Sequence, residues 1–400
     1  MNQLLSAASI IFVILSCQAK NSEQTSKAPI QPNAVDTSIV LGAEQLDAYL
    51  PLIGERPVAL VVNQTSLIND SHLVDTLLGL GIKIKKVFAP EHGFRGEAGA
   101  GELIQDGKDL KTGLPIVSLY GKQKKPTSSH LEDVEVVIFD IQDVGTRFYT
   151  YISTMHYVME ACAENKKEVM VLDRPNPNGA FVDGPIREEH LKSFVGMHPI
   201  PILHGLTVGE MAKMINGEQW LENKDECLLT VIPLKNYHHN KPYALPVRPS
   251  PNLPNDLAVQ LYPSLCLFEG TVMSVGRGTL FPFQVLGYPD PSYGSFTFTP
   301  KSIEGMSVNP KHKEKQCYGI DFRDSQGPIG LSLSHLLDFY QQYGNKEAFF
   351  TSSFDRLAGT EALKKQILAG LDETQIRQSW EPGLGEFKTL RKKYLLYPDN

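Results

Sequence analysis

The feature of this sequence that most constrains its fold is a regular alternation of apolar runs and helix-like segments in the first half of the chain. The runs have strand length, and such runs are typical of strands buried on both faces of a parallel sheet. The segments between them carry apolar residues at helical spacing. The runs lie at 58–62, 82–89, 116–119, 134–139 and 169–172, and helices are expected at 72–80, 150–165 and 207–216. The alternation predicts an α/β fold with a mostly parallel, Rossmann-like sheet covered on both faces.

Polar or ionisable residues follow these runs directly, where each strand is expected to end. In a parallel sheet these ends share one edge, and ligands bind beyond that edge in open α/β folds. A surface turn with ordinary charges would explain one such residue, but five segments that end this way favour a catalytic crevice. The residues are Asn63, Glu91 with His92, Tyr120, Asp140 with Asp143, and Asp173 with Arg174.

The loop after the first run lacks the glycines of a nucleotide site. Asn63-Gln64-Thr65-Ser66 stands where a G-x-G-x-x-G motif would be, and the chain has no G-x-x-x-x-G-K-[ST] motif. Glycines after the second run are widely spaced among charged residues, which is weak support for phosphate binding. We therefore expect a Rossmann-like fold that uses no cofactor and no metal.

Composition sets the number of domains and excludes one class of partner. A chain of 400 residues with 42% hydrophobic residues fits roughly two domains. The net charge of -7 argues against a nucleic-acid partner. Five prolines within 242–256 indicate a junction, so we expect a catalytic domain at 38–255 and a smaller auxiliary α+β domain at 256–400. In the second domain we expect a strand at 316–322, helices at 332–343 and from Asp372, and a helical tail at 384–397.

The N-terminus resembles a targeting segment. Residues 7–15 form an apolar run that is too short to span a bilayer, and Ile14-Leu15-Ser16-Cys17 resembles a lipobox. The segment before the run has no Lys or Arg, so a plain secretory signal remains the alternative. We expect a signal peptide at 1–16, a polar tether at 17–37, and a place in a bacterial envelope, either periplasmic or anchored through lipid on Cys17. That anchor would be the sole membrane contact.

Four cysteines follow Cys17, and an oxidising compartment would permit disulfides among them. Their spacing fits no metal site, and three full pairings are possible. We favour small buried core positions for them. They are Cys162, Cys227, Cys266 and Cys317.

Six longer segments resemble a known family, the NamZ-type bacterial exo-β-N-acetylmuramidases, formerly a domain of unknown function. The segments are APEHGFRG at 89–96, DIQDVGTRFYTY at 140–151, LDRPNPNG at 172–179, HGLTVGEMA at 204–212, PSPNLP at 249–254 and FEGTVMSVGRGT at 268–279. The resemblance covers about residues 38–398. It implies an enzyme that releases terminal β-linked N-acetylmuramic acid from the non-reducing ends of peptidoglycan fragments. It also implies a site in the cleft between a Rossmann-like domain and a smaller C-terminal domain, with Glu91 as the suspected catalytic carboxylate.

Glycoside cleavage needs a proton for the leaving oxygen, and Glu91 is the candidate acid. A carboxyl group in a partly dry cleft can stay protonated near neutrality. His92 could tune it, although a lone histidine is as often structural. Asp140 and Asp143 are candidates for a second carboxylate, about 5 Å away if it is the nucleophile and roughly 6.5 to 9.5 Å away if it activates water. One of them could instead brace Arg147. A third route, which uses the N-acetyl oxygen of the sugar, stays open.

N-acetylmuramic acid carries a lactyl carboxylate, which an arginine could grip with two hydrogen bonds. The arginines in the matched segments include Arg95, Arg147, Arg174 and Arg277, and we favour Arg147 and Arg277. Glu269 and Arg277 are the two charged residues of an apolar stretch, and an internal salt bridge is the alternative for them. Other candidate substrate ligands are Tyr149, Asn176, Asn178, His204 and Asn252.

Two other functions compete with a glycosidase. His92, Asp140 and Asp143 could bind a metal in an envelope hydrolase. The chain could also be a non-catalytic lipoprotein that binds muropeptides. The expected partners in the main hypothesis are peptidoglycan-derived muropeptides and disaccharides.

Overall fold

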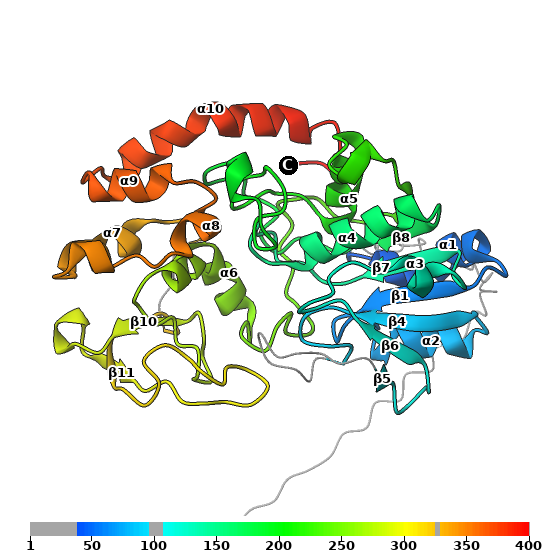
Figure 1. The fold of residues 1–400 in the computed structure, drawn as a ribbon, viewed down its shortest axis with the longest axis horizontal. Coiled ribbons are helices and arrows are strands. Elements are labelled where there is room, and N and C mark those ends of the chain that lie inside the picture. Colours follow the sequence, from blue (N-terminus) through cyan, green and yellow to red (C-terminus); the bar gives the residue numbers. More distant parts are fainter. Residues whose placement is uncertain (1–37, 96–106, 325–328, 400) are drawn as a thin grey trace, which may run out of the picture. The chain divides into compact units, whose positions relative to one another are not determined.

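A seven-stranded sheet organises the first half of the chain in this computed structural model, which describes residues 38–95, 107–324 and 329–399. The strand order is β5-β6-β4-β1-β7-β8-β9, and all neighbours are parallel except β5 and β6 (Figure 1). The strands are β1 (Val58–Val62), β4 (Ile84–Ala89), β5 (Gly107–Lys108), β6 (Pro115–Ser118), β7 (Val136–Asp140), β8 (Glu168–Leu172) and β9 (Leu228–Ile232). The mostly parallel α/β fold predicted from the alternation is confirmed.

The central strands of this sheet are buried on both faces, because side chains along β1, β4, β7 and β8 alternate between two hydrophobic clusters. Val61 of β1 packs with α4 (Tyr151–Glu164) and α5 (Val208–Gly217) on one face. Leu60 packs with α1 (Leu46–Ile53) and α2 (Leu73–Gly79) on the other. Continuous apolar runs are therefore what this sheet requires.

The second half of the chain is α+β. Its antiparallel sheet has the order β10-β12-β11, formed by Val285–Tyr288, Cys317–Asp321 and Phe296–Phe298. Its helices are α6 (Asp256–Leu265), α7 (Ser334–Gln342), α8 (Phe354–Ala358), α9 (Ala362–Leu368) and α10 (Glu373–Arg391). The hydrophobic cluster that contains α4 and α5 continues into these helices, so the two halves share one core.

Short elements complete the described part of the chain. The hairpin of β2 (Leu67–Ile68) and β3 (Ser71–His72) precedes α2, and α3 (Ser128–Leu131) precedes β7. Helix α2 is capped by His72, whose Nδ1 accepts from Val74 N. Thr207 caps α5 and forms a capping box with Glu210.

The C-terminal tail departs from the prediction. Helix α10 ends at Arg391 and does not continue through 397, because the tail makes other contacts with the first half. Leu396 N donates to Glu210 Oε1 at 2.8 Å, and Tyr397 Oη donates to Asp173 Oδ2 at 2.6 Å. The last described residue, Asp399, accepts two hydrogen bonds from Arg391.

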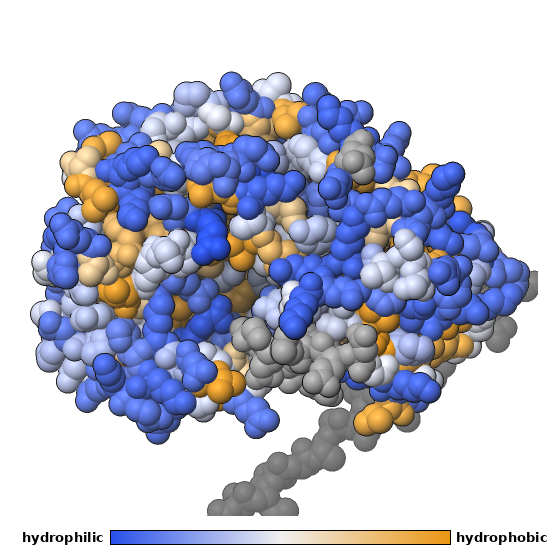
Figure 2. Space-filling model, in the orientation of Figure 1, coloured by the Kyte–Doolittle hydropathy of each residue, from blue (hydrophilic) through white to orange (hydrophobic). Residues whose placement is uncertain are grey.

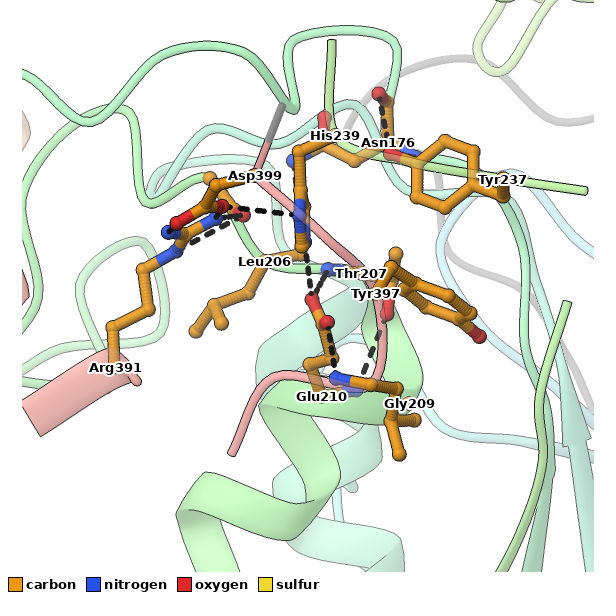
Figure 3. Close-up of polar contacts among 12 residues, drawn as sticks. Asn176, Leu206, Thr207, Gly209, Glu210, Tyr237, His239, Arg391, Tyr397 and Asp399 are labelled. Carbon is orange, nitrogen blue, oxygen red and sulfur yellow. Dashed lines mark hydrogen bonds and ion pairs between the residues drawn. The ribbon is translucent and has the colours of Figure 1, made fainter. Parts of the chain in front are cut away.

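Figure 3 shows how a buried histidine joins this tail to α5. His239 lies between Glu210 and Asp399, with Nε2 2.9 Å from Glu210 Oε2 and Nδ1 3.1 Å from Asp399 Oδ1. Asp173, which follows β8, accepts hydrogen bonds from Tyr397 Oη and from Thr207 Oγ1, the latter at 2.7 Å. This part of the sheet edge therefore holds the C-terminal tail.

The surface face in Figure 2 is mainly hydrophilic, with hydrophobic residues in small separate areas. Within the described residues, no helix has the length and apolar character needed to cross a membrane. Cys17, the expected signal peptide and the tether lie outside the described residues.

Candidate active site

A tight turn carries Glu91 out of the end of β4. Gly93 N donates to Pro90 O at 3.0 Å, which closes the turn over Glu91 and His92. His92 has φ 71°, a left-handed conformation that is uncommon for a residue with a side chain. Held backbone strain of this kind is concentrated at functional sites, where surrounding contacts maintain it.

Glu91 faces a cavity of about 210 Å³ at this end of the sheet. The walls come from both halves of the chain, including the start of α4, residues 250–253, α6 and the segment around Arg277. Six of the predicted site residues line it together: Glu91, His92, Tyr149, Asn252, Glu269 and Arg277.

Three hydroxyl groups surround Glu91. Thr150 Oγ1 donates to Glu91 Oε2 at 3.3 Å, and Tyr151 Oη donates to Glu91 O at 3.4 Å. The Tyr120 phenol lies beside the Glu91 side chain, and both line the same cavity. Burial raises the pKa of Tyr120, and the neighbouring charge of Glu91 raises it further. Thr150 therefore donates to the carboxylate, and Tyr120 presents a second hydroxyl group next to it.

His92 and Asn252 are anchored to the same proline-rich segment. Ser250 Oγ lies 3.3 Å from His92 Nε2 and accepts from Asn252 N at 3.1 Å. Asn252 Nδ2 donates to Met306 O at 2.9 Å, which orients the amide. Tyr149 Oη donates to Pro249 O at 2.8 Å. These bonds fix the wall of the cavity that the proline-rich segment forms next to the β4 turn.

Arg277 and Glu269 form a two-point ion pair within the cavity wall. Nε and Nη2 of Arg277 lie 2.5 and 3.0 Å from the Glu269 carboxylate oxygens. Burial alone would lower the pKa of Arg277, but the charge and hydrogen bonds of Glu269 outweigh that effect and raise the pKa. The guanidinium also lies over Phe283, 5.0 Å from the ring centre. The side chains of Arg277 and Glu269 remain 25% and 27% exposed, so the pair is open to a ligand.

The two predicted second carboxylates do not line this cavity. Asp140 is fully buried and accepts from Arg174 Nε and Nη2 at 2.6 and 2.9 Å. Asp143 accepts from Gly145 N at 2.7 Å and lies 3.9 Å from His204 Nε2. Burial raises the pKa of Asp143 to about 7. Neither carboxylate braces Arg147, contrary to the expectation from their spacing.

Arg147 and Arg95 use their donors elsewhere. Arg147 is fully buried, and its Nη1 and Nη2 atoms donate to four backbone carbonyl groups. These carbonyls belong to Pro185, Ile200, Leu357 and Ala358. Arg95 pairs with Asp109 at 3.0 and 2.8 Å. Of the two arginines favoured for the lactyl group, Arg277 lines the cavity, whereas Arg147 is buried and binds backbone carbonyl groups.

Three more of the predicted substrate ligands do not line the cavity and bind backbone groups instead. They are Asn176, Asn178 and His204. Asn176 Nδ2 donates to Leu206 O, and Asn178 Nδ2 donates to Val144 O, both at 2.9 Å. His204 Nδ1 accepts from Leu206 N at 3.2 Å, and burial lowers the pKa of His204 to about 3. These side chains brace the loops behind the cavity.

Among the described residues, one group of three acidic side chains is close enough together to hold a metal ion, and it lies away from the β4 turn. Glu160, Glu164 and Glu222 come together there. Lys125 binds Glu160 and Glu164 at 2.7 and 2.6 Å. His92, Asp140 and Asp143, the trio considered for a metal, are not gathered into such a group within the described ranges. The four described cysteines are free and buried.

Several cavity residues were not singled out as site residues from the sequence. Thr150 and Ser250 fall in the quoted segments, so the signals were present, and Tyr120 was named only as a residue at a strand end. Phe194 comes from a loop and Leu357 from α8, and neither has a pattern in the sequence that points to a site.

Two family models together match most of this chain. One, described as "Exo-beta-N-acetylmuramidase NamZ, N-terminal", matches residues 58–257, and its C-terminal counterpart matches residues 260–397. A curated relative from Bacillus subtilis (strain 168), "Peptidoglycan beta-N-acetylmuramidase NamZ", is 38% identical over 405 residues. That alignment covers 96% of this chain and 95% of the relative.

Two solved structures share the fold, and both are DUF1343 family proteins from Bacteroides fragilis NCTC 9343. The first is 45% identical with a TM-score of 0.85, and the match covers 91% of this chain and 100% of that one. The second is 29% identical with a TM-score of 0.76, covering 90% and 99% of the two chains.

Proposed function

Because this chain belongs to the NamZ exo-β-N-acetylmuramidase family, we propose that it removes terminal β-linked N-acetylmuramic acid from the non-reducing ends of peptidoglycan fragments. The observation that carries the proposal is the pairing, in one cavity, of Glu91 on its strained turn with a partly exposed arginine held by Glu269. A proton donor and a carboxylate receptor are the two groups that this substrate requires.

Glu91 is the acid in this proposal. It protonates the leaving glycosidic oxygen and becomes a carboxylate that Tyr120 and Thr150 stabilise by donating hydrogen bonds.

Arg277 receives the lactyl carboxylate. Its Nε and Nη2 atoms face Glu269, and among the described residues no acceptor takes a hydrogen bond from Nη1. That Nη1 group can donate to a ligand carboxylate without breaking the ion pair. Glu269 thereby presents the guanidinium in a fixed orientation.

The cavity also bears on how the anomeric carbon is attacked. Among its described lining residues the carboxylates are Glu91 and Glu269, and Glu269 is bound to Arg277. This supports the route in which the N-acetyl oxygen of the sugar attacks, a double displacement that gives the β-anomer first. NMR of the first product formed from a disaccharide with terminal muramic acid distinguishes retention from inversion, and initial α-anomer would reject this route.

The decisive experiment compares wild type with Glu91→Gln on a chromogenic β-muramide. The glutamine side chain keeps the shape of the carboxyl group but cannot supply a proton, so we expect a folded protein with kcat reduced on the order of 1,000-fold or more. Wild-type kcat in the variant would reject Glu91 as the acid. Wild-type activity that survives EDTA, with free muramic acid as product, would exclude both the metal hydrolase and the non-catalytic binding protein.

We further propose an envelope location with lipid on Cys17, supported by the lipobox-like segment 14–17. Membrane fractionation tests it. Cys17→Ala should move the protein from the membrane to the soluble envelope fraction, and an unchanged distribution would reject the anchor.

A further inference from the structure

We infer that Tyr120 is the positioning residue for Glu91, whose carboxyl group it holds in the cavity and whose carboxylate it stabilises as the proton leaves. The inference rests on the proposed glycosidase function. It gives Tyr120, which the sequence placed only at a strand end near the crevice, a role that no comparison assigns.

The register of the sheet brings the two residues together. β4 and β6 are parallel neighbours in which Ala89 is opposite Ser118, and Leu119 N donates to Ala89 O at 2.8 Å. Glu91 and Tyr120 each stand two residues beyond this matched pair. Backbone hydrogen bonds of the sheet, which are rigid compared with a surface loop, therefore set their proximity.

The local contacts of Tyr120 suit it to donate. Tyr120 N donates to Ser118 Oγ at 3.3 Å, which fixes the chain as it leaves β6. The phenol is half-buried, lines the cavity and lies beside the Glu91 side chain. Burial and the charge of Glu91 raise the pKa of Tyr120, so the phenol keeps its proton across the working pH range.

A donor in this position contributes more as the reaction proceeds. Hydrogen bonds to a charged acceptor are stronger than those to a neutral one. The bond from Tyr120 therefore gains strength as Glu91 passes its proton to the glycosidic oxygen and acquires a full charge. Thr150 Oγ1 is the second donor, at 3.3 Å from Oε2.

The kinetic test is Tyr120→Phe, which keeps the ring and removes the hydroxyl group. We expect kcat on a chromogenic β-muramide to fall about 10- to 100-fold with KM within about twofold. We also expect the basic limb of the kcat profile to move to higher pH, because the carboxylate form loses a donor. Tyr318→Phe, at a half-buried tyrosine of β12 outside the cavity, is the matched control and should leave both unchanged.

Unchanged kcat and an unchanged pH profile would overturn the inference. Covalent labelling of Tyr120 by a fluorinated muramide would also overturn it, because the phenol would then be the nucleophile. Crystal structures of wild type and Tyr120→Phe separate this inference from the proposed function. Even if wild type failed to hydrolyse muramides, a Glu91 carboxyl displaced in the variant would support positioning, and an unmoved one would reject it.

Discussion

Arg277 and Arg147 carry the same expectation in the sequence, but their surroundings differ. Arg277 lies in the cavity wall with one side of its guanidinium bound to Glu269. Arg147 has both Nη atoms bound to backbone carbonyl groups. The residue type was predictable from the lactyl group of the substrate. Which arginine faces the cavity depends on long-range contacts that no local pattern encodes.

Arg277→Ala should reduce recognition of the lactyl group. We expect KM for a β-muramide to rise about 10- to 100-fold while KM for the matching glucosaminide changes little, since a charge-assisted hydrogen bond contributes about 1.5 to 3 kcal/mol. Parallel kinetics on the two sugars measure this difference. Equal losses on both would reject the assignment.

Asp143 gives a prediction about pH and stability. Burial raises its pKa to about 7 from an ordinary value of 3.8. Between these values the folded protein retains a proton that the unfolded chain releases, so the free energy of unfolding falls as pH rises through this window.

Asp143→Asn should flatten that dependence, because an amide does not ionise. We expect the variant to gain on the order of 1 to 4 kcal/mol relative to wild type between pH 4.5 and 7.5, measured by urea unfolding at both pH values. Asp173, whose pKa burial raises to about 6, leaves a residual slope in the variant. Turnover should remain within a few-fold of wild type, and a loss above about 1,000-fold would instead make Asp143 catalytic.

At the scale of elements, the strands and most helices followed from local patterns. Five buried runs became β1, β4, β6, β7 and β8, because both faces of the sheet are covered. The prediction of a helix that continues to residue 397 was wrong, because the helical spacing there competes with contacts to residues distant in sequence. Tyr397 and Leu396 bind Asp173, Leu234 and Glu210, all more than 160 residues away.

Tyr397→Phe tests how much this tail stabilises the fold. The change removes the donor to Asp173 and the acceptor for Leu234 N, 2.7 Å away. Buried groups left without a partner should lower the free energy of unfolding by about 1 to 3 kcal/mol in urea titrations. Tyr394→Phe is the matched control, because its partner Glu218 is partly exposed, and we expect a loss of roughly 0 to 1 kcal/mol. Equal losses in the two variants would contradict a special role for Tyr397.

At the scale of the whole molecule, Arg147 joins the two halves. Its Nη1 atom donates to the carbonyl groups of Pro185 and Ile200 in the first half. Its Nη2 atom donates to those of Leu357 and Ala358 at the end of α8. Gly359 makes room for this contact: its φ is 75°, and a Cβ atom there would lie 2.4 Å from Nη2. The prolines at 242–256 predicted a junction, but nothing local in the sequence predicted this connection between the two halves.

Arg147→Met should therefore destabilise the protein as a whole. Four carbonyls lose their donors, and we expect the free energy of unfolding to fall by roughly 3 to 5 kcal/mol. Calorimetry or urea unfolding measures the loss, and the muramide-to-glucosaminide ratio of any folded fraction should stay at the wild-type value. Arg95→Met, at a partly exposed ion pair, is the control, with an expected loss of about 1 kcal/mol. A changed muramide-to-glucosaminide ratio in Arg147→Met would show that Arg147 takes part in substrate binding.

The four described cysteines are buried and unpaired. None of them cross-links the fold, so the described part of the chain does not need an oxidant to reach its native state. Thiol reductants should leave its melting temperature unchanged, and a host whose cytosol is reducing should be able to produce the active enzyme from residues 18–400.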